Sequence, residues 1–195
     1  MRTIRVLVFL LLTGIWAVAE GASGVVLSPQ DAGSKPLSPP AKAQCKFPDG
    51  QTIIMDYSSP RMRGRKIFGE LVPYGEVWRT GANQATTFVA DGNIITVNGT
   101  RIPAGSYTIF TVPNSDNWTL IINKHTGEAG IPYKYQSEEL ARVPMKVTKL
   151  SSPVENFTIA FDRTGASCMM NMRWENTQAS VEFTEMNTDM PTLTQ

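Results

Sequence analysis

The chain has 195 residues, with 18 basic and 17 acidic side chains and a formal net charge of +1. Such a balance gives no electrostatic reason to expect a nucleic acid or an anionic membrane as a partner. The single histidine, His125, lies in the turn-like NKHTG, whereas a catalytic zinc usually takes two or three histidines. No G-x-S-x-G motif presents a serine for a catalytic triad, and no GxGxxG or P-loop motif occurs. We therefore expect no metal and no cofactor.

The first 19 residues have the pattern of a secretory signal peptide. Arg2 and Arg5 precede the 14-residue apolar run VLVFLLLTGIWAVA, which ends in small residues at 17 and 19. A membrane-spanning helix needs about 20 apolar residues. We therefore predict cleavage before Glu20 and a periplasmic or secreted protein without a membrane segment. Cleavage removes two of the 18 basic residues, which leaves 16 against 17 acidic ones.

Composition divides the rest of the chain into three parts. Residues 20–43 are rich in Pro, Ser, Gly and Ala and predict a disordered linker. Residues 184–195 are polar and predict a disordered tail. Residues 44–183 are long enough to bury a core and are predicted to form one domain.

Strands are predicted where apolar residues alternate between two faces. In QTIIMDY, the residues that share one face are Ile53, Met55 and Tyr57. Three later stretches give equivalent faces: Trp118, Leu120 and Ile122 in NWTLIINK; Phe157, Ile159 and Phe161 in ENFTIAFD; and Cys168, Met170, Met172 and Trp174 in SCMMNMRW.

Turn signals separate the predicted strands. We predict turns at Asn98-Gly99, at 103–105 (PAG) and at 175–177 (ENT), the last of which joins SCMMNMRW to ASVEF. The one helical candidate is SEELAR, at 137–142. Short strands with turn signals about every ten residues predict an all-β fold. We expect an antiparallel β-sandwich, jelly-roll-like or immunoglobulin-like, with a small β-barrel as the alternative.

The two cysteines predict a disulfide, because exported proteins usually pair their cysteines. A Cys45–Cys168 bridge would join the two ends of the domain. The loop it closes exceeds 100 residues, so the bridge would stabilise the fold by about 5 kcal/mol in the chain-entropy model. Two free buried thiols are the alternative.

The stretch SSPRMRGRKIFGELVPYGEVWRTGAN, residues 58–83, is the densest group of ligand-type side chains. Its arginines at 61, 63 and 65 would project from one side of an extended backbone. Guanidinium groups bind carboxylate, phosphate or sulfate, and aromatic rings stack on sugars. We therefore predict a face for an anionic or saccharide ligand, formed by Arg61, Arg63, Arg65, Tyr74, Trp78, Arg79 and Asn83.

The same residues also suit a purely structural corner. Trp78 would then fill the core, Arg79 would bond loop carbonyls, and the other arginines would pair with Glu70 and Glu76. Gly81 and Asn83 suit turns with positive φ. Both interpretations remain open on the sequence alone.

Long stretches resemble one known family. They include DYSSPRMRGRKIFGELVPYGEVWRTGANQATTF, IPAGSYTIFTVP, WTLIINKHTG, LARVPMKV and PVENFTIAFD. In this order they are similar to exported bacterial proteins known as domain of unknown function 2911, over about residues 45–183. The resemblance implies an all-β domain with a signal peptide and no established activity. The matching positions of the opening segment are Ser58, Ser59, Pro60, Gly64, Arg65, Gly69, Pro73, Gly75, Trp78, Arg79, Gly81, Ala82 and Asn83.

Two functional hypotheses follow. The first is a non-catalytic exported binding module for an unidentified small molecule, with residues 58–83 as its ligand face. The second is a metal-independent hydrolase or lyase of glycans that uses carboxylates and arginines. A pair of carboxylates about 5–9 Å apart in a cleft would favour the second. The candidates for such a pair are Asp56, Glu70, Glu76, Glu138 and Glu139. A third hypothesis is an envelope protein whose surface meets another protein.

Overall fold

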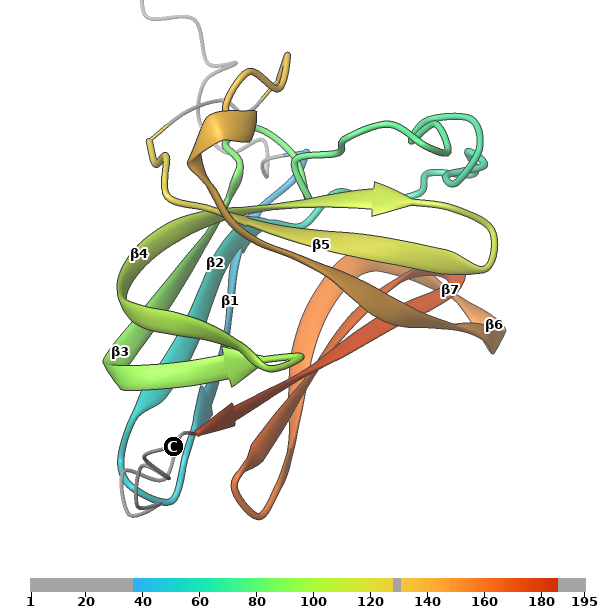
Figure 1. Cartoon of the computed structure of the whole chain (residues 1–195). Coiled ribbons are helices and arrows are strands. Elements are labelled where there is room, and N and C mark those ends of the chain that lie inside the picture. Colours follow the sequence, from blue (N-terminus) through green and yellow to red (C-terminus); the bar gives the residue numbers. More distant parts are fainter. Residues whose placement is uncertain (1–36, 128–130, 186–195) are drawn as a thin grey trace, which may run out of the picture. The chain divides into compact units, whose positions relative to one another are not determined.

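The computed structural model describes residues 37–127 and 131–185, with the backbone alone at 93–96. These residues form an antiparallel all-β unit (Figure 1). The predicted signal peptide and residues 20–36 of the predicted linker lie outside the described residues, as do residues 186–195 of the predicted tail. The described part of the chain contains no helix with the length and apolar character to cross a membrane.

Seven strands follow one another in both sequence and sheet order. Their bounds are β1 Pro40–Lys46, β2 Thr52–Ser58, β3 Thr86–Val97, β4 Thr100–Pro113, β5 Asn117–Asn123, β6 Glu139–Thr164 and β7 Ser167–Glu185, and a 3-10 turn, η2, spans Gln136–Glu138. The end of β3 also pairs with the end of β7. The sheet therefore closes on itself from β3 to β7, which confirms the all-β prediction and gives it the form of a small barrel.

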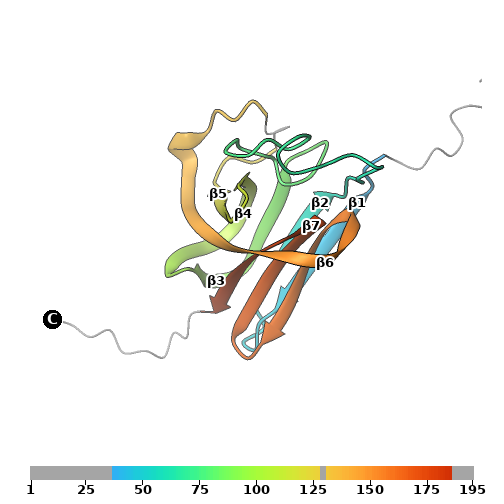
Figure 2. The ribbon, with the colours of Figure 1, turned by 90° about the vertical axis from the view of Figure 1, so that its right-hand side faces the viewer.

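The hairpin of β6 and β7 is bent because its two strands differ in length across one region. Between the pairs Lys149–Thr177 and Thr158–Arg173, β6 advances nine residues and β7 only four. Glu175, at this bend, has a positive φ of 53°. Beyond the bend, the distal half of the hairpin turns to lie beside β1 (Figure 2).

The bend also changes which residues of β7 face the core. Before it the even-numbered positions are buried, from Cys168 to Trp174, and after it the odd-numbered ones, from Ala179 to Phe183. The predicted inner face of SCMMNMRW is therefore confirmed. In β2, the predicted inner face of QTIIMDY is also buried.

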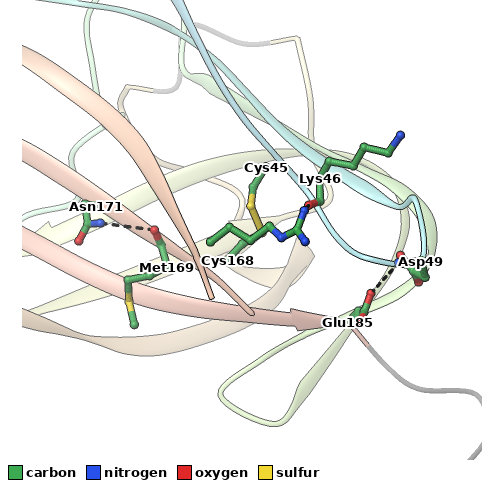
Figure 3. The surroundings of a disulfide bond; sticks show 8 residues. Cys45, Lys46, Asp49, Cys168, Met169, Asn171 and Glu185 are labelled. Carbon is green, nitrogen blue, oxygen red and sulfur yellow. Dashed lines mark hydrogen bonds between the residues drawn. A yellow bond between two sulfur atoms is a disulfide. The ribbon is translucent and has the colours of Figure 1, made fainter. Parts of the chain in front are cut away.

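The predicted disulfide is present and ties β1 to β7 (Figure 3). Cys45 and Cys168 have Cα atoms 6.2 Å apart and are separated by 123 residues in the sequence. Next to the bridge, Arg163 Nη1 donates to the Lys46 carbonyl at 3.3 Å. This end of the unit is therefore held by a covalent bond and by contacts between β1 and β6.

Three turn or helix predictions are wrong. Residues 175–177 lie inside a continuous β7, opposite the bulge of β6, and their turn-type side chains suit the bend of the hairpin. Residues 103–105 lie within β4, opposite a register shift in β3. Of SEELAR, only residues 137–138 belong to a 3-10 turn, and the rest begins β6. The turn at Asn98-Gly99 is confirmed, with φ values of 46° and 77°.

The predicted boundary between linker and domain is also displaced. β1 begins at Pro40, so residues 40–43 of the predicted linker are part of the sheet. Ala43 faces the core, and Pro40 pairs with Ser58 at the end of β2. The small residues of β1, which resemble those of a linker, nevertheless suit a strand at the edge of the sheet.

We expect replacement of both cysteines, Cys45→Ala with Cys168→Ala, to lower the free energy of unfolding by about 2–5 kcal/mol. The reason is that the bridge restricts a long loop in the unfolded chain. Urea unfolding of the oxidised protein and the double variant measures the difference. Adding reductant should shift the midpoint of the wild type only; equal midpoints for both proteins in oxidising buffer would contradict the stabilising role.

Candidate functional site

Residues 59–85, here called the crossing segment, connect β2 to β3 without regular secondary structure. One end of the segment continues the sheet at β4. The pairing of β3 with β4 reaches only Ile109, and beyond it Trp78 exchanges hydrogen bonds of 2.8 and 2.9 Å with Thr111. Gly75 N also donates to the Pro113 carbonyl at 2.9 Å. The crossing segment therefore takes the place of β3 along this edge of β4.

The other end of the segment lies along the outer edge of β6, at its bulge. Phe157 N donates to the Pro60 carbonyl at 2.8 Å, and Met62 N donates to the Glu155 carbonyl at 2.9 Å. Ser59 Oγ donates to the Phe157 carbonyl at 2.7 Å. The irregular segment thus satisfies backbone groups that β7 cannot reach.

The three clustered arginines do not project from one side, so that prediction is wrong. Arg63 and Gly64 have positive φ values of 51° and 71°, which turns the backbone between Arg61 and Arg65. Arg65 donates from Nε to the Met62 carbonyl at 3.0 Å and from Nη2 to the Arg61 carbonyl at 2.8 Å. Its guanidinium therefore holds the turn in which it lies.

Arg79 also donates to the backbone, from Nη1 to the Asn83 carbonyl at 2.6 Å. Asn83 has a positive φ of 59° and donates from Nδ2 to the Ser38 carbonyl at 3.3 Å. Glu70 forms an ion pair with Lys66 at 3.2 Å. The bond from Arg79 matches the structural interpretation. Arg65, which that interpretation paired with Glu70 or Glu76, bonds loop carbonyls instead.

Trp78 stands between the crossing segment and the core. Its half-buried ring is nearly parallel to that of Trp174, with centroids 5.9 Å apart and an interplanar angle of 18°. The edge of Phe157 packs at 5.0 Å. The indole N–H of Trp78 donates to the Gly81 carbonyl at 3.1 Å, and that of Trp174 to the Glu155 carbonyl at 3.2 Å. Both rings are thereby fixed in orientation.

A pocket of about 400 Å³, here called the crossing pocket, opens against these two rings. Four of the seven predicted ligand-binding residues line it: Arg65, Trp78, Arg79 and Asn83. Tyr74 lines a different hollow, and Arg61 and Arg63 line neither. The structure thus brings together the arginine, tryptophan and asparagine part of the predicted face and separates Tyr74 from it.

Several lining residues were not among the predicted site residues. Trp174 comes from β7, and the alternating pattern of SCMMNMRW predicted only that this residue faces inward. Leu71 and Ile131 line the pocket with side chains that are 45% and 44% exposed. No sequence signal connects Ile131 or Trp174 to the crossing segment, because the contacts are formed only in the folded chain.

A polar network anchors the segment that carries Ile131. Tyr133 donates from its hydroxyl to Glu139 Oε1 at 2.8 Å and accepts from the buried Asn123 Nδ2 at 3.0 Å. Burial and the bond to Glu139 raise the pKa of Tyr133 to about 12, so its hydroxyl stays a donor at neutral pH. Arg142 contacts the same carboxylate at 2.9 Å and lowers the pKa of Glu139.

Each of three hollows in the described part of the chain is lined by one carboxylate. Glu76 lines the crossing pocket, Glu182 a second hollow and Asp116 a third. None of these three linings contains the two carboxylates that glycoside hydrolysis employs. Within the same described residues, no three His, Cys, Asp or Glu side chains form a group that would hold a metal ion.

We expect Arg79→Ala to lower the free energy of unfolding by about 1–2 kcal/mol, since it removes a charged donor to a loop carbonyl. Thermal and urea unfolding measure the change. Arg101→Ala, at an exposed position of β4, is the matched control and should change stability little. If Arg79→Ala were as stable as the control, Arg79 would not hold the loop.

The crossing segment lies within a region that matches a known family. Residues 38–183 match a family described as protein of unknown function, DUF2911. Comparisons with curated proteins and with solved structures give no match. The matched region runs from just before β1 to two residues before the end of β7, and so contains the crossing pocket and nearly the whole sheet. The chain therefore belongs to the DUF2911 family.

Proposed function

We propose that the protein is a binding module whose crossing pocket takes a small ligand with a ring that can stack on an indole and with an anionic group. The observation that carries this proposal is the pocket itself, which places the half-buried ring of Trp78, stacked on the buried Trp174, beside the guanidinium groups of Arg65 and Arg79. Its volume of about 400 Å³ lies in the range of small-molecule sites. A sugar acid has the matching chemistry.

The rigidity of the pocket supports binding. Trp78 and Trp174 each have an indole N–H bonded to a backbone carbonyl, so little side-chain entropy remains to be lost when a ligand arrives. Arg65 and Arg79 each hold a loop carbonyl with part of the guanidinium fork. A guanidinium has five N–H donors, so the two backbone bonds of Arg65 fix its position and use only part of the group. The structural and the ligand-binding interpretations are therefore compatible.

The distribution of carboxylates favours a binding module over a carboxylate-dependent hydrolase. Glu76 is the single carboxylate along the crossing pocket. An acid and a second carboxylate at about 5–9 Å would be needed for either mechanism of glycoside hydrolysis. A single carboxylate near two arginines would instead accept hydrogen bonds from the ligand and so orient it in the pocket.

We further propose that the protein is exported to the periplasm or secreted. The disulfide supports this location, because such bonds persist mainly in oxidising compartments. The apolar run at 6–19 has the length and flanks of a signal peptide.

The test is a ligand screen with a variant that fills the pocket. Ala82 lines the crossing pocket, and Ala82→Trp is expected to occupy its space. Ala104→Trp, at an exposed position of β4, is the matched control. Thermal shift is measured with neutral and acidic saccharides, peptidoglycan fragments and inorganic phosphate. A ligand at 100 times its Kd should stabilise the wild type and the control by about 2.7 kcal/mol and leave Ala82→Trp unaffected.

Two outcomes would contradict the proposal. One is a ligand that stabilises Ala82→Trp as much as the wild type, which would put its site elsewhere. The other is the absence of a shift with every acidic saccharide, which would remove the proposed ligand class.

A further inference from the structure

We infer that the protein binds the surface of an anionic lipid bilayer with the end of the unit that carries the crossing segment. This end, here called the crossing end, consists of the crossing segment, residues 131–138 and the residues just before β1. The three segments lie together in both views of the ribbon (Figure 1 and Figure 2). The surface that they form surrounds the mouth of the crossing pocket and does not depend on a ligand inside it.

The large apolar side chains that are exposed in the described residues are all found at this end. They are Leu37, Leu71, Tyr74 and Ile131, with exposed fractions between 44% and 69%. Leu71 and Ile131 line the crossing pocket, and so does Ser38, the neighbour of Leu37. Three segments that are distant in the sequence thus present apolar side chains around one opening. Exposed apolar side chains gathered in this way mark an interaction site.

The fold itself keeps Leu71 outside the core. Ile67, Phe68 and Val72 are buried, and Val72 N donates to the Ile67 carbonyl at 2.9 Å. Gly69 N donates to the Val72 carbonyl at 2.9 Å, which closes a tight turn. Leu71 stands within this turn and is 45% exposed, although the residue after it is buried. Its exposure is therefore a fixed feature of the crossing segment.

The crossing segment also concentrates positive charge. It contains five basic and two acidic residues, whereas the other described residues contain ten basic and eleven acidic ones. The near-neutral balance of the whole chain therefore conceals a basic end. Only one of the five charges has a carboxylate partner within the described residues, in the ion pair of Lys66 with Glu70. The other four belong to Arg61, Arg63, Arg65 and Arg79.

Cationic groups stand beside the exposed apolar side chains. Arg63 Nη2 donates to the Leu37 carbonyl at 3.4 Å, which holds these two residues next to each other. Arg61 and Arg63 are both exposed. Lys134 is also exposed and follows Ile131 by three residues. Cations therefore flank the apolar side chains on both the crossing segment and the neighbouring loop.

Apolar side chains surrounded by cations match the chemistry of a bilayer interface. Leucine and isoleucine side chains enter the boundary between headgroups and acyl chains, while guanidinium groups stay at the level of the phosphates. A tyrosine ring such as that of Tyr74 favours the same zone, because one end is apolar and the other polar. Each basic residue near an anionic leaflet strengthens binding about fivefold.

The form of the crossing end favours a bilayer over an acidic protein. A stable protein complex buries a continuous surface of about 800 Å² on each partner. Here the apolar side chains stand singly on separate segments, and the hollow between them is the crossing pocket of about 400 Å³, which has the size for a small molecule. A bilayer surface accepts separate side chains, because lipids rearrange around each one.

The test is cosedimentation of the oxidised protein with lipid vesicles. The exported form, residues 20–195, is used so that the apolar run at 6–19 contributes nothing. We expect binding to vesicles of phosphatidylglycerol and phosphatidylcholine in equal parts, and much weaker binding to phosphatidylcholine alone. Raising the salt concentration from about 0.1 M to about 1 M shortens the Debye length from about 10 Å to about 3 Å, and should release the protein from the anionic vesicles.

A pair of double variants tests the contribution of charge. Arg61→Gln with Arg63→Gln should weaken binding to the anionic vesicles about thirtyfold, because two cations leave the crossing end. Lys46→Gln with Arg101→Gln is the matched control, since it removes the same net charge from exposed positions outside the crossing end. The control should bind nearly as well as the wild type.

Single variants test the contribution of the apolar side chains. Leu71→Glu should weaken vesicle binding at least tenfold, because it removes an inserting side chain and adds a negative charge. Thr164→Glu, at the exposed end of β6, adds the same charge elsewhere and should have little effect. Ala82→Trp fills the crossing pocket and should leave vesicle binding unchanged.

Four results would overturn the inference. They are no binding to anionic vesicles, equal binding to neutral and anionic vesicles, binding that the arginine double variant and Leu71→Glu both leave unchanged, and loss of binding in Ala82→Trp. The last would place a lipid headgroup inside the crossing pocket. Binding of a polyglutamate peptide without binding of vesicles would assign the crossing end to an acidic protein instead. Circular dichroism and the melting temperature of each variant establish that a loss of binding is not a loss of fold.

Discussion

The unpaired edge of β6 is the constraint on which the architecture depends. Beyond the bulge, β6 pairs with β7 on one side only, so its other edge presents backbone groups that need partners. The chain that leaves β2 supplies them. Ile159 N donates to the Tyr57 hydroxyl at 3.0 Å. Phe157 N donates to the Pro60 carbonyl, and Met62 N donates to the Glu155 carbonyl. An irregular segment thereby becomes a fixed part of the sheet.

This fixation explains why a loop without regular structure can form a pocket. The crossing segment is attached to β6 at one end and to β4, through Trp78, at the other. Trp78 and Trp174 stack beneath it, and Arg65 and Arg79 hold its turns by bonding carbonyls. The residues that stabilise the corner are the same ones that border the crossing pocket. A rigid corner of this kind places aromatic and cationic groups without requiring movement when a ligand binds.

Local patterns predicted the strand faces well, because a two-residue period depends only on neighbours in the sequence; the inward face that ends at Trp174 is an example. They failed where one residue changes the backbone. Glu175 switches the buried positions of β7 from even to odd, and Arg63 turns a stretch that alternation suggested was extended. The candidate site was predicted in part, since Tyr74 lies in another hollow. Glu155 could not be predicted as an anchor, because its contact to residue 62 spans the chain.

The central claim, that the crossing pocket is a ligand site, is tested most directly by the indole N–H signals of the protein in a ¹H–¹⁵N spectrum. Trp78 and the buried Trp174, which is 2% exposed, line the pocket, whereas Trp118 does not. Titration with a ligand found in the screen should shift the signals of Trp78 and Trp174 and leave that of Trp118 in place. Saturable binding with no change at Trp78 and Trp174 would contradict the claim.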